Sequence, residues 1–193
     1  MSRPREFDAD HALHQCMEVF WTKGYHATSY EDLTRTTQVK KQSLYGVFKS
    51  KRELFLKSLA LYREQSIELL EERAAGKKSP VEKLQAICEA ALFPDEAAVK
   101  RGCLMINASL EFDSGDEEIN REVMLMTGTV EKILLRVIRS GQEQGEITTR
   151  MTDRELAAHL NNAIGGAKVL EKSGTPREQV SHILHTTIAL MQA

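Results

Sequence analysis

One helix-start signal recurs six times along the chain. A Ser or Thr followed three residues later by Glu lets two side chains satisfy two backbone N–H groups that a helix N-terminus leaves without partners. The pattern occurs at Thr28–Glu31, Ser50–Glu53, Ser79–Glu82, Ser114–Glu117, Thr152–Glu155 and Thr175–Glu178. One match is a weak signal, but six in a chain with almost no alternating strand pattern predict an all-α fold.

The spacing of apolar residues predicts the bodies of about nine helices. They are expected near residues 8–23, 30–37, 41–48, 51–70, 80–93, 102–112, 119–145, 156–170 and 180–191. Gly24 and Pro94 stand where two of these helices should end. The resulting division is a head of three short helices in residues 1–50 and a larger helical body in residues 51–193.

Composition and local charge narrow the class of protein. The 193 residues contain no apolar run of the ~18 residues that a membrane helix needs, and the three cysteines are too scattered for a disulfide framework. We therefore expect a cytoplasmic protein with reduced thiols and no membrane partner. Seven basic residues between positions 35 and 57 face a single acid, Glu53, although the whole chain has a net charge of −2. A patch of this kind is a candidate surface for a polyanion.

An ordered set of short motifs begins just before that patch and continues through it. They are G-Y-x-x-T-S at Gly24–Ser29, L-Y-x-x-F at Leu44–Phe48 and K-S-K-x-E-L at Lys49–Leu54. This stretch resembles the N-terminal domain of the TetR/AcrR family of transcriptional regulators. The resemblance implies a helix-turn-helix that binds double-stranded, near-palindromic operator DNA, a homodimer, and a repressor released by a small-molecule effector of unknown identity or by a reactive electrophile.

The physical requirements of a helix-turn-helix agree with that resemblance, because its second helix must expose its first residues to the major groove. Leu33, Val39, Leu44 and Phe48 are expected to form the small core. The residues predicted to bind DNA are Thr28, Ser29, Lys40, Lys41, Gln42, Ser43, Tyr45, Lys49 and Lys51. Of these, Lys41, Gln42 and Ser43 should contact bases, while Thr28, Tyr45 and Lys51 should contact phosphates. Two positions depart from the family pattern: Gln38 replaces a turn glycine and Lys40 a capping hydroxyl.

The body carries a second, narrower resemblance. Arg101–Glu111 contains G-C-L-x-x-N-x-x-x-E, found in a subset of these regulators, and residues 166–174 resemble their penultimate helix. We predict an apolar effector cavity lined from among Phe55, Leu59, Tyr62, Phe93, Cys103, Met105, Ile106, Phe112 and Met124. Cys103 follows cations at a helix start, which favours a thiolate, so we predict a redox switch there. The resemblance further implies that Lys172, in the segment of the penultimate helix, lies near this thiol. A small buried hydrophobic residue is the alternative role for Cys103.

Apolar stripes on the last two helices predict a homodimer built from a four-helix bundle. Their residues are Leu156, Leu160, Ala163, Ala167, Val180, Leu184, Ile188 and Met191. Two other classes stay open: a helical interaction module without DNA binding, and a helical enzyme. No phosphate loop or nucleophile motif supports an enzyme. The pairs His11 with His14 and His182 with His185 lack further metal ligands at matching spacing, so we expect neither a catalytic site, a metal site nor a cofactor.

Overall fold

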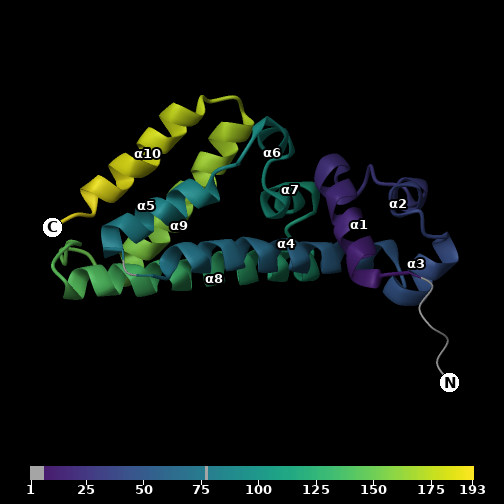
Figure 1. The fold of residues 1–193 in the computed structure, drawn as a ribbon, viewed down its shortest axis with the longest axis horizontal. Coiled ribbons are helices and arrows are strands. Elements are labelled where there is room, and N and C mark those ends of the chain that lie inside the picture. The colour runs from purple at the N-terminus through teal and green to yellow at the C-terminus, as the bar shows by residue number, and fades with distance from the viewer. Residues whose placement is uncertain (1–6, 77) are drawn as a thin grey trace, which may run out of the picture. The chain divides into compact units, whose positions relative to one another are not determined.

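The computed structural model describes residues 7–76 and 78–193, and within them the fold is all-α (Figure 1). The helices are α1 (Ala9–Lys23), α2 (Tyr30–Thr37), α3 (Lys41–Phe48), α4 (Lys51–Ala74), α5 (Pro80–Ala91), α6 (Glu96–Arg101), α7 (Leu104–Glu111), α8 (Glu117–Glu143), α9 (Asp153–Lys172) and α10 (Arg177–Leu190). The only strand-like pairing in these described residues is an isolated bridge between Ile147 and Gln192. The predicted fold class is confirmed.

One helix was not expected from the sequence. The six-residue α6 follows Pro94, and the Asp95 side chain caps it by accepting a hydrogen bond from the Ala98 N–H at 2.8 Å. Aspartate before a short run containing two alanines is an ordinary helix start. The predicted helix near residues 102–112 is correspondingly shorter, because Gly102 ends α6 and α7 begins at Leu104.

The six predicted helix starts have mixed outcomes. Ser79 and Thr152 form complete capping boxes with Glu82 and Glu155, as predicted. Ser50 accepts the Glu53 N–H at 3.0 Å, which is half of a box.

The other three predicted starts are wrong in detail. The box at α2 is formed by Ser29 and Asp32, one residue beyond Thr28 and Glu31. At α8, Asp116 rather than Ser114 accepts the Ile119 N–H. Helix α10 starts after Pro176 without a side-chain cap, so Thr175 does not serve there.

The chain forms two compact units. The first comprises the described residues up to Glu64 together with Leu104–Val123, and the second comprises Gln65–Cys103 and Met124–Ala193. The packing of the chain therefore does not divide at residue 50. The start of α4, helix α7 and the start of α8 belong to the same unit as α1, α2 and α3. The core of this first unit includes the fully buried Met17, Phe20, Leu33, Phe55 and Leu59.

The second unit is built from α5, α6, α9 and α10 with the remaining parts of α4 and α8. Seven of the eight residues assigned to the dimer stripes are buried within this subunit: Leu156, Leu160, Ala167, Val180, Leu184, Ile188 and Met191. The eighth, Ala163, is half-buried. Assigning these stripes to a subunit interface is therefore wrong, because they pack against the core of their own chain. Among residues 7–76 and 78–193, no helix is both long and apolar enough to cross a membrane.

Candidate nucleic-acid interface and effector domain

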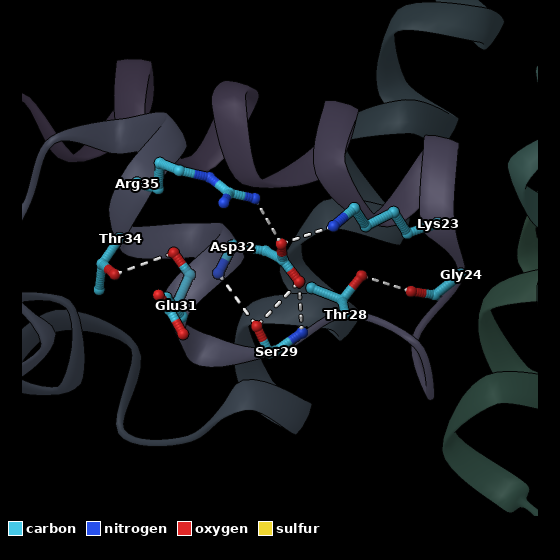
Figure 2. Close-up of polar contacts among 8 residues, drawn as sticks. All are labelled: Lys23, Gly24, Thr28, Ser29, Glu31, Asp32, Thr34 and Arg35. Carbon is cyan, nitrogen blue, oxygen red and sulfur yellow. Dashed lines mark hydrogen bonds and ion pairs between the residues drawn. The ribbon is translucent and has the colours of Figure 1, made fainter.

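A carboxylate at the start of α2 ties this helix to the end of α1 (Figure 2). Asp32 Oδ2 accepts hydrogen bonds from the Ser29 N–H at 3.0 Å and the Ser29 hydroxyl at 2.8 Å. Asp32 Oδ1 pairs with Lys23 Nζ at 2.5 Å and with Arg35 Nη2 at 2.8 Å. The hydrogen bond from Lys23, followed by those from Ser29, holds the pKa of Asp32 well below its usual range. The first helix of the helix-turn-helix is thus fixed at its N-terminus.

The turn between α2 and α3 has a left-handed residue at Gln38, the position where the family pattern has glycine. Gln38 takes the left-handed conformation with φ 55°, where glycine is the usual residue, and its side-chain Nε2 donates to the Arg35 carbonyl at 2.6 Å. Lys40 is the N-cap of α3 and makes no side-chain capping bond. The turn is therefore kept without glycine, and the Lys40 side chain is exposed to solvent.

Helix α3 has one buried face and one basic exposed face. Leu44 and Phe48 are buried, with Leu33 of α2 completing the predicted core, while Val39 is half-buried. The exposed side chains of the predicted DNA-binding set are Ser29, Lys40, Lys41, Gln42 and Lys49, whereas Ser43, Tyr45 and Lys51 are half-buried. Such a helix can enter the major groove with its N-terminal residues.

Two tyrosines support the start of α3. The rings of Tyr30 and Tyr45 lie 4.9 Å apart, and Lys41 Nζ lies 4.8 Å from the centre of the Tyr30 ring. The Tyr30 hydroxyl accepts the Lys51 N–H at 2.8 Å, which ties the start of α4 to α2. Burial raises the pKa of Tyr30 above its usual value, so this hydroxyl stays neutral. Tyr30 was not predicted as a site residue.

Two predicted phosphate contacts have other partners in this structure. Thr28 is 1% exposed and its hydroxyl donates to the Gly24 carbonyl at 2.5 Å. The prediction for Thr28 is therefore wrong in this conformation, since its hydroxyl is buried and already bonded. Lys51 Nζ lies 4.4 Å from the centre of the Tyr25 ring, a cation–π contact. Burial lowers the pKa of Lys51.

The nine residues proposed for an effector cavity divide between the two units. Phe55, Leu59, Tyr62, Met105, Ile106 and Phe112 belong to the first unit, and Phe93, Cys103 and Met124 to the second. Six are buried, while Ile106 and Phe112 are half-buried. Met124 is 73% exposed, so its assignment to a buried cavity wall is wrong.

Phe55 and Phe112 also have a packing role. Their ring centroids lie 5.7 Å apart, and each lies about 5 Å from the Tyr25 ring (5.0 and 5.1 Å). This aromatic cluster contributes to the core of the first unit.

Lys172 lies beside the residue that precedes Cys103. A Cβ added to Gly102 would lie 2.5 Å from Cδ, 3.1 Å from Cε and 3.2 Å from Nζ of Lys172, so the lysine side chain lies directly over Gly102. Cys103, the next residue, is 5% exposed. Burial raises the pKa of Cys16 and of Cys88 to about 12, which makes those two thiols poor nucleophiles.

Sequence reasoning missed a buried carboxylate beside Lys172. Glu171 is 2% exposed; its Oε2 accepts the Phe93 N–H at 3.0 Å and its Oε1 pairs with Arg177 at 3.1 Å. Arg177 also donates to the Phe93 carbonyl. These bonds fix the C-terminal end of α9 to the segment before α6. A lone glutamate near a helix end gives no sequence signal for such a role.

Comparison with known proteins identifies the group to which these features belong. Residues 12–57 match the family described as bacterial regulatory proteins, tetR family, and residues 80–186 match the tetracyclin repressor-like C-terminal domain. The chain belongs to the TetR family. It is therefore a DNA-binding transcriptional regulator whose N-terminal helix-turn-helix precedes a helical C-terminal domain.

Individual relatives agree with this assignment. This TetR-family chain is 32% identical to the HTH-type transcriptional repressor ComR of Escherichia coli strain K12, over 97% of this chain and 90% of ComR. It is 28% identical to the TetR family transcriptional regulator CifR, solved as a cysteine mutant with 26-bp double-strand operator DNA. That match has a TM-score of 0.81 and covers 97% of this chain and 98% of CifR. A TetR-family regulator from Cytophaga hutchinsonii shares the fold alone, with 19% identity and a TM-score of 0.84 over 95% and 94% of the two chains.

Proposed function

We propose that this TetR-family regulator is a cytoplasmic transcriptional repressor that binds a near-palindromic operator and leaves it when a small effector acts on the body. Its role is regulatory rather than catalytic. The observation that carries the DNA-binding part is the arrangement of α3, which buries Leu44 and Phe48 and exposes Lys40, Lys41 and Gln42 at its first turn. The repressors and operator complexes among its relatives support the same role.

The predicted DNA contacts divide into base readout and phosphate binding. Lys41, Gln42 and Ser43 lie on the first turn of α3 and are assigned to bases, as predicted. Of the three predicted phosphate contacts Thr28 is buried, so we retain Tyr45 and add the exposed Lys40 and Lys49. Lys49 is a better test of a phosphate contact than Lys51, because Lys51 Nζ already lies on the Tyr25 ring.

A pair of substitutions separates these two roles, using an operator selected from a random pool of duplexes. Lys49→Ala should weaken binding to all sequences alike and lower the slope of log affinity against log salt by about one. Gln42→Ala should instead relax the preference at one base pair by about 1–3 kcal/mol. Identical effects of both changes on operator and random DNA would contradict the assignment.

A homodimer would place two copies of α3 on half-sites about one turn of DNA apart. Because the predicted stripes are buried, we assign the interface to the outward faces of α9 and α10, which expose Val169, Leu170, Ile183 and Leu190. Ile183 and Leu190 also line a groove of about 590 Å³ along α10. Sedimentation at micromolar concentration should show a dimer, and Ile183→Glu with Leu190→Glu should convert it to a monomer. A wild-type monomer would contradict this part of the proposal.

We assign the effector-sensitive point to Cys103. A small electrophile would add to its thiolate: a carbon–sulfur bond forms, the electrophile's carbon–carbon π bond breaks, and its α-carbon takes a proton. Lys172 lies over Gly102, the residue before Cys103, and we propose that it assists this reaction. The bulky adduct in a buried position would then favour a conformation with lower operator affinity.

N-ethylmaleimide is a suitable probe, since it adds to thiolates in this way. Operator binding is measured before and after treatment of the wild type, Cys103→Ser and Lys172→Ala. After treatment the wild type should release the operator and Cys103→Ser should keep it. Lys172→Ala should be labelled at Cys103 more slowly than the wild type. Mild hypochlorite is the parallel oxidant test. Equal release by wild type and Cys103→Ser, or labelling of Cys103 no faster than that of Cys16 and Cys88, would refute the switch.

A further inference from the structure

The last residue of α7 binds the backbone of the loop that leads into the helix-turn-helix. Glu111 Oε2 accepts the Tyr25 N–H at 2.9 Å, and Glu111 Oε1 accepts the His26 N–H at 2.6 Å. Both oxygens of one carboxylate are therefore used on two consecutive backbone donors. These partners lie 86 and 85 residues away in the sequence.

The loop is shaped to receive this carboxylate. Gly24 has φ 81° and ψ 171°, a region of backbone conformation that is essentially restricted to glycine. A Cβ at this position would lie 2.9 Å from Glu111 Oε2 and 3.1 Å from Oε1. The missing side chain thus allows both the bend and the close approach of Glu111. Glycine at the first position of the G-Y-x-x-T-S motif is therefore required both by the backbone conformation and by the space that Glu111 occupies.

Aromatic rings pack around the same joint. The Phe112 ring lies 5.1 Å from the Tyr25 ring and 5.2 Å from the His26 ring. Arg52 pairs with Asp116 at 2.7 Å, which attaches the start of α4 to the segment that follows α7. By sequence Glu111 belongs to the matched C-terminal domain, yet Leu104–Val123 pack in one compact unit with the helix-turn-helix.

The loop held by Glu111 continues directly into the first helix of the DNA-binding motif. Thr28 closes it by donating to the Gly24 carbonyl at 2.5 Å, and Ser29 then caps α2 through Asp32 (Figure 2). A shift of Tyr25 and His26 would therefore shift the start of α2. We propose that Glu111 is a positioning residue for DNA binding: it holds this loop in the orientation that operator binding requires, without contacting DNA.

Simple electrostatics and positioning predict opposite effects when the charge is removed. Taking an acid from a DNA-binding protein should strengthen its binding to a polyanion. Loss of two charge-assisted hydrogen bonds that orient the loop should weaken operator binding, by about tenfold or more for Glu111→Ala, since such bonds typically contribute more than the 1.4 kcal/mol that corresponds to tenfold. Glu111→Gln keeps one acceptor and should lie between the wild type and Glu111→Ala. Asp113→Asn, an exposed acid two residues away, is the matched control for charge alone.

The experiment measures operator affinity against salt for the full-length wild type and these three variants, with amide hydrogen exchange at Tyr25 and His26. We expect operator binding to be weaker than wild type in Glu111→Gln and weaker still in Glu111→Ala, with an unchanged salt slope. Amide exchange at Tyr25 and His26 should be faster in both variants. Asp113→Asn should lose no operator affinity. Wild-type affinity for Glu111→Ala would overturn the proposal. An equal change in Asp113→Asn, or an altered salt slope, would do so as well, because either would show an effect of charge alone.

Discussion

Gly102→Ala probes the backbone beside the proposed reactive thiol. Gly102 ends α6 with φ 71° and ψ −162°, a combination that costs a residue with a side chain about 1–3 kcal/mol. The added Cβ would also lie 2.5 Å from Lys172 Cδ. The exposed Lys172 side chain has rotatable bonds through which it can relieve this contact. Alanine recovers about 0.4–1 kcal/mol by restricting the unfolded chain.

The net expectation is a loss of about 1–2 kcal/mol in the free energy of unfolding. For a chain of this size that corresponds to a fall in Tm of about 2–8 °C. Thermal and urea unfolding at one fixed protein concentration measure it, because the Tm of a dimer depends on concentration. In the Lys172→Ala background the loss should persist within about 0.5 kcal/mol, since the strain lies in the backbone. Full recovery there, or no loss in the single variant, would refute the reasoning.

Three further perturbations test other parts of the fold. Ser79→Ala should cost about 1 kcal/mol by urea unfolding, because Ser79 forms a complete capping box with Glu82, while Ser114→Ala, which removes no cap, should cost less than about 0.5 kcal/mol. Phe20→Ala should cost about 3–5 kcal/mol, because this ring is fully buried and packs 5.0 Å from Phe55; a smaller loss would mean that the first unit is loosely packed. The hydrogen bond from Arg52 lowers the pKa of Asp116, so its contribution to stability is present above the unfolded pKa near about 4 and is lost as pH falls further. Tm measured from pH 7 to pH 3 should therefore fall more steeply below about pH 4 in the wild type than in Asp116→Asn, and parallel curves would contradict this.

Local sequence patterns predicted most of the helices and few of the long-range contacts. Helices α2 and α3 span the predicted residues 30–37 and 41–48, because apolar spacing acts within a few residues, although the cap of α2 lies one residue beyond the predicted one and Lys40 makes no capping bond. The apolar stripes of α9 and α10 each lie on one helix face, as predicted. Periodicity does not say whether such a face packs on its own chain or on a partner, and these faces are buried within their own chain.

The candidate site shows the same limit. Exposure of Lys40, Lys41 and Gln42 followed from the amphipathic pattern of one short helix. The roles of Glu111 and Glu171 did not, because each depends on backbone donors more than 75 residues away in sequence. Thr28 was misplaced for a related reason: its hydroxyl closes the loop before α2 instead of facing solvent.

Binding to duplex DNA as a function of salt is the most direct test of the central claim. A near-palindromic operator selected from a random pool and a scrambled duplex of equal length are compared by fluorescence anisotropy between about 50 and 200 mM salt, a range over which 6–10 phosphate contacts lose about 10³–10⁵ in affinity. We expect a steep linear fall of log affinity with log salt on both duplexes, with the operator bound at least about 10³-fold more tightly. Equal affinity for the two duplexes, or binding that does not change with salt, would contradict sequence-specific DNA recognition by this helix-turn-helix.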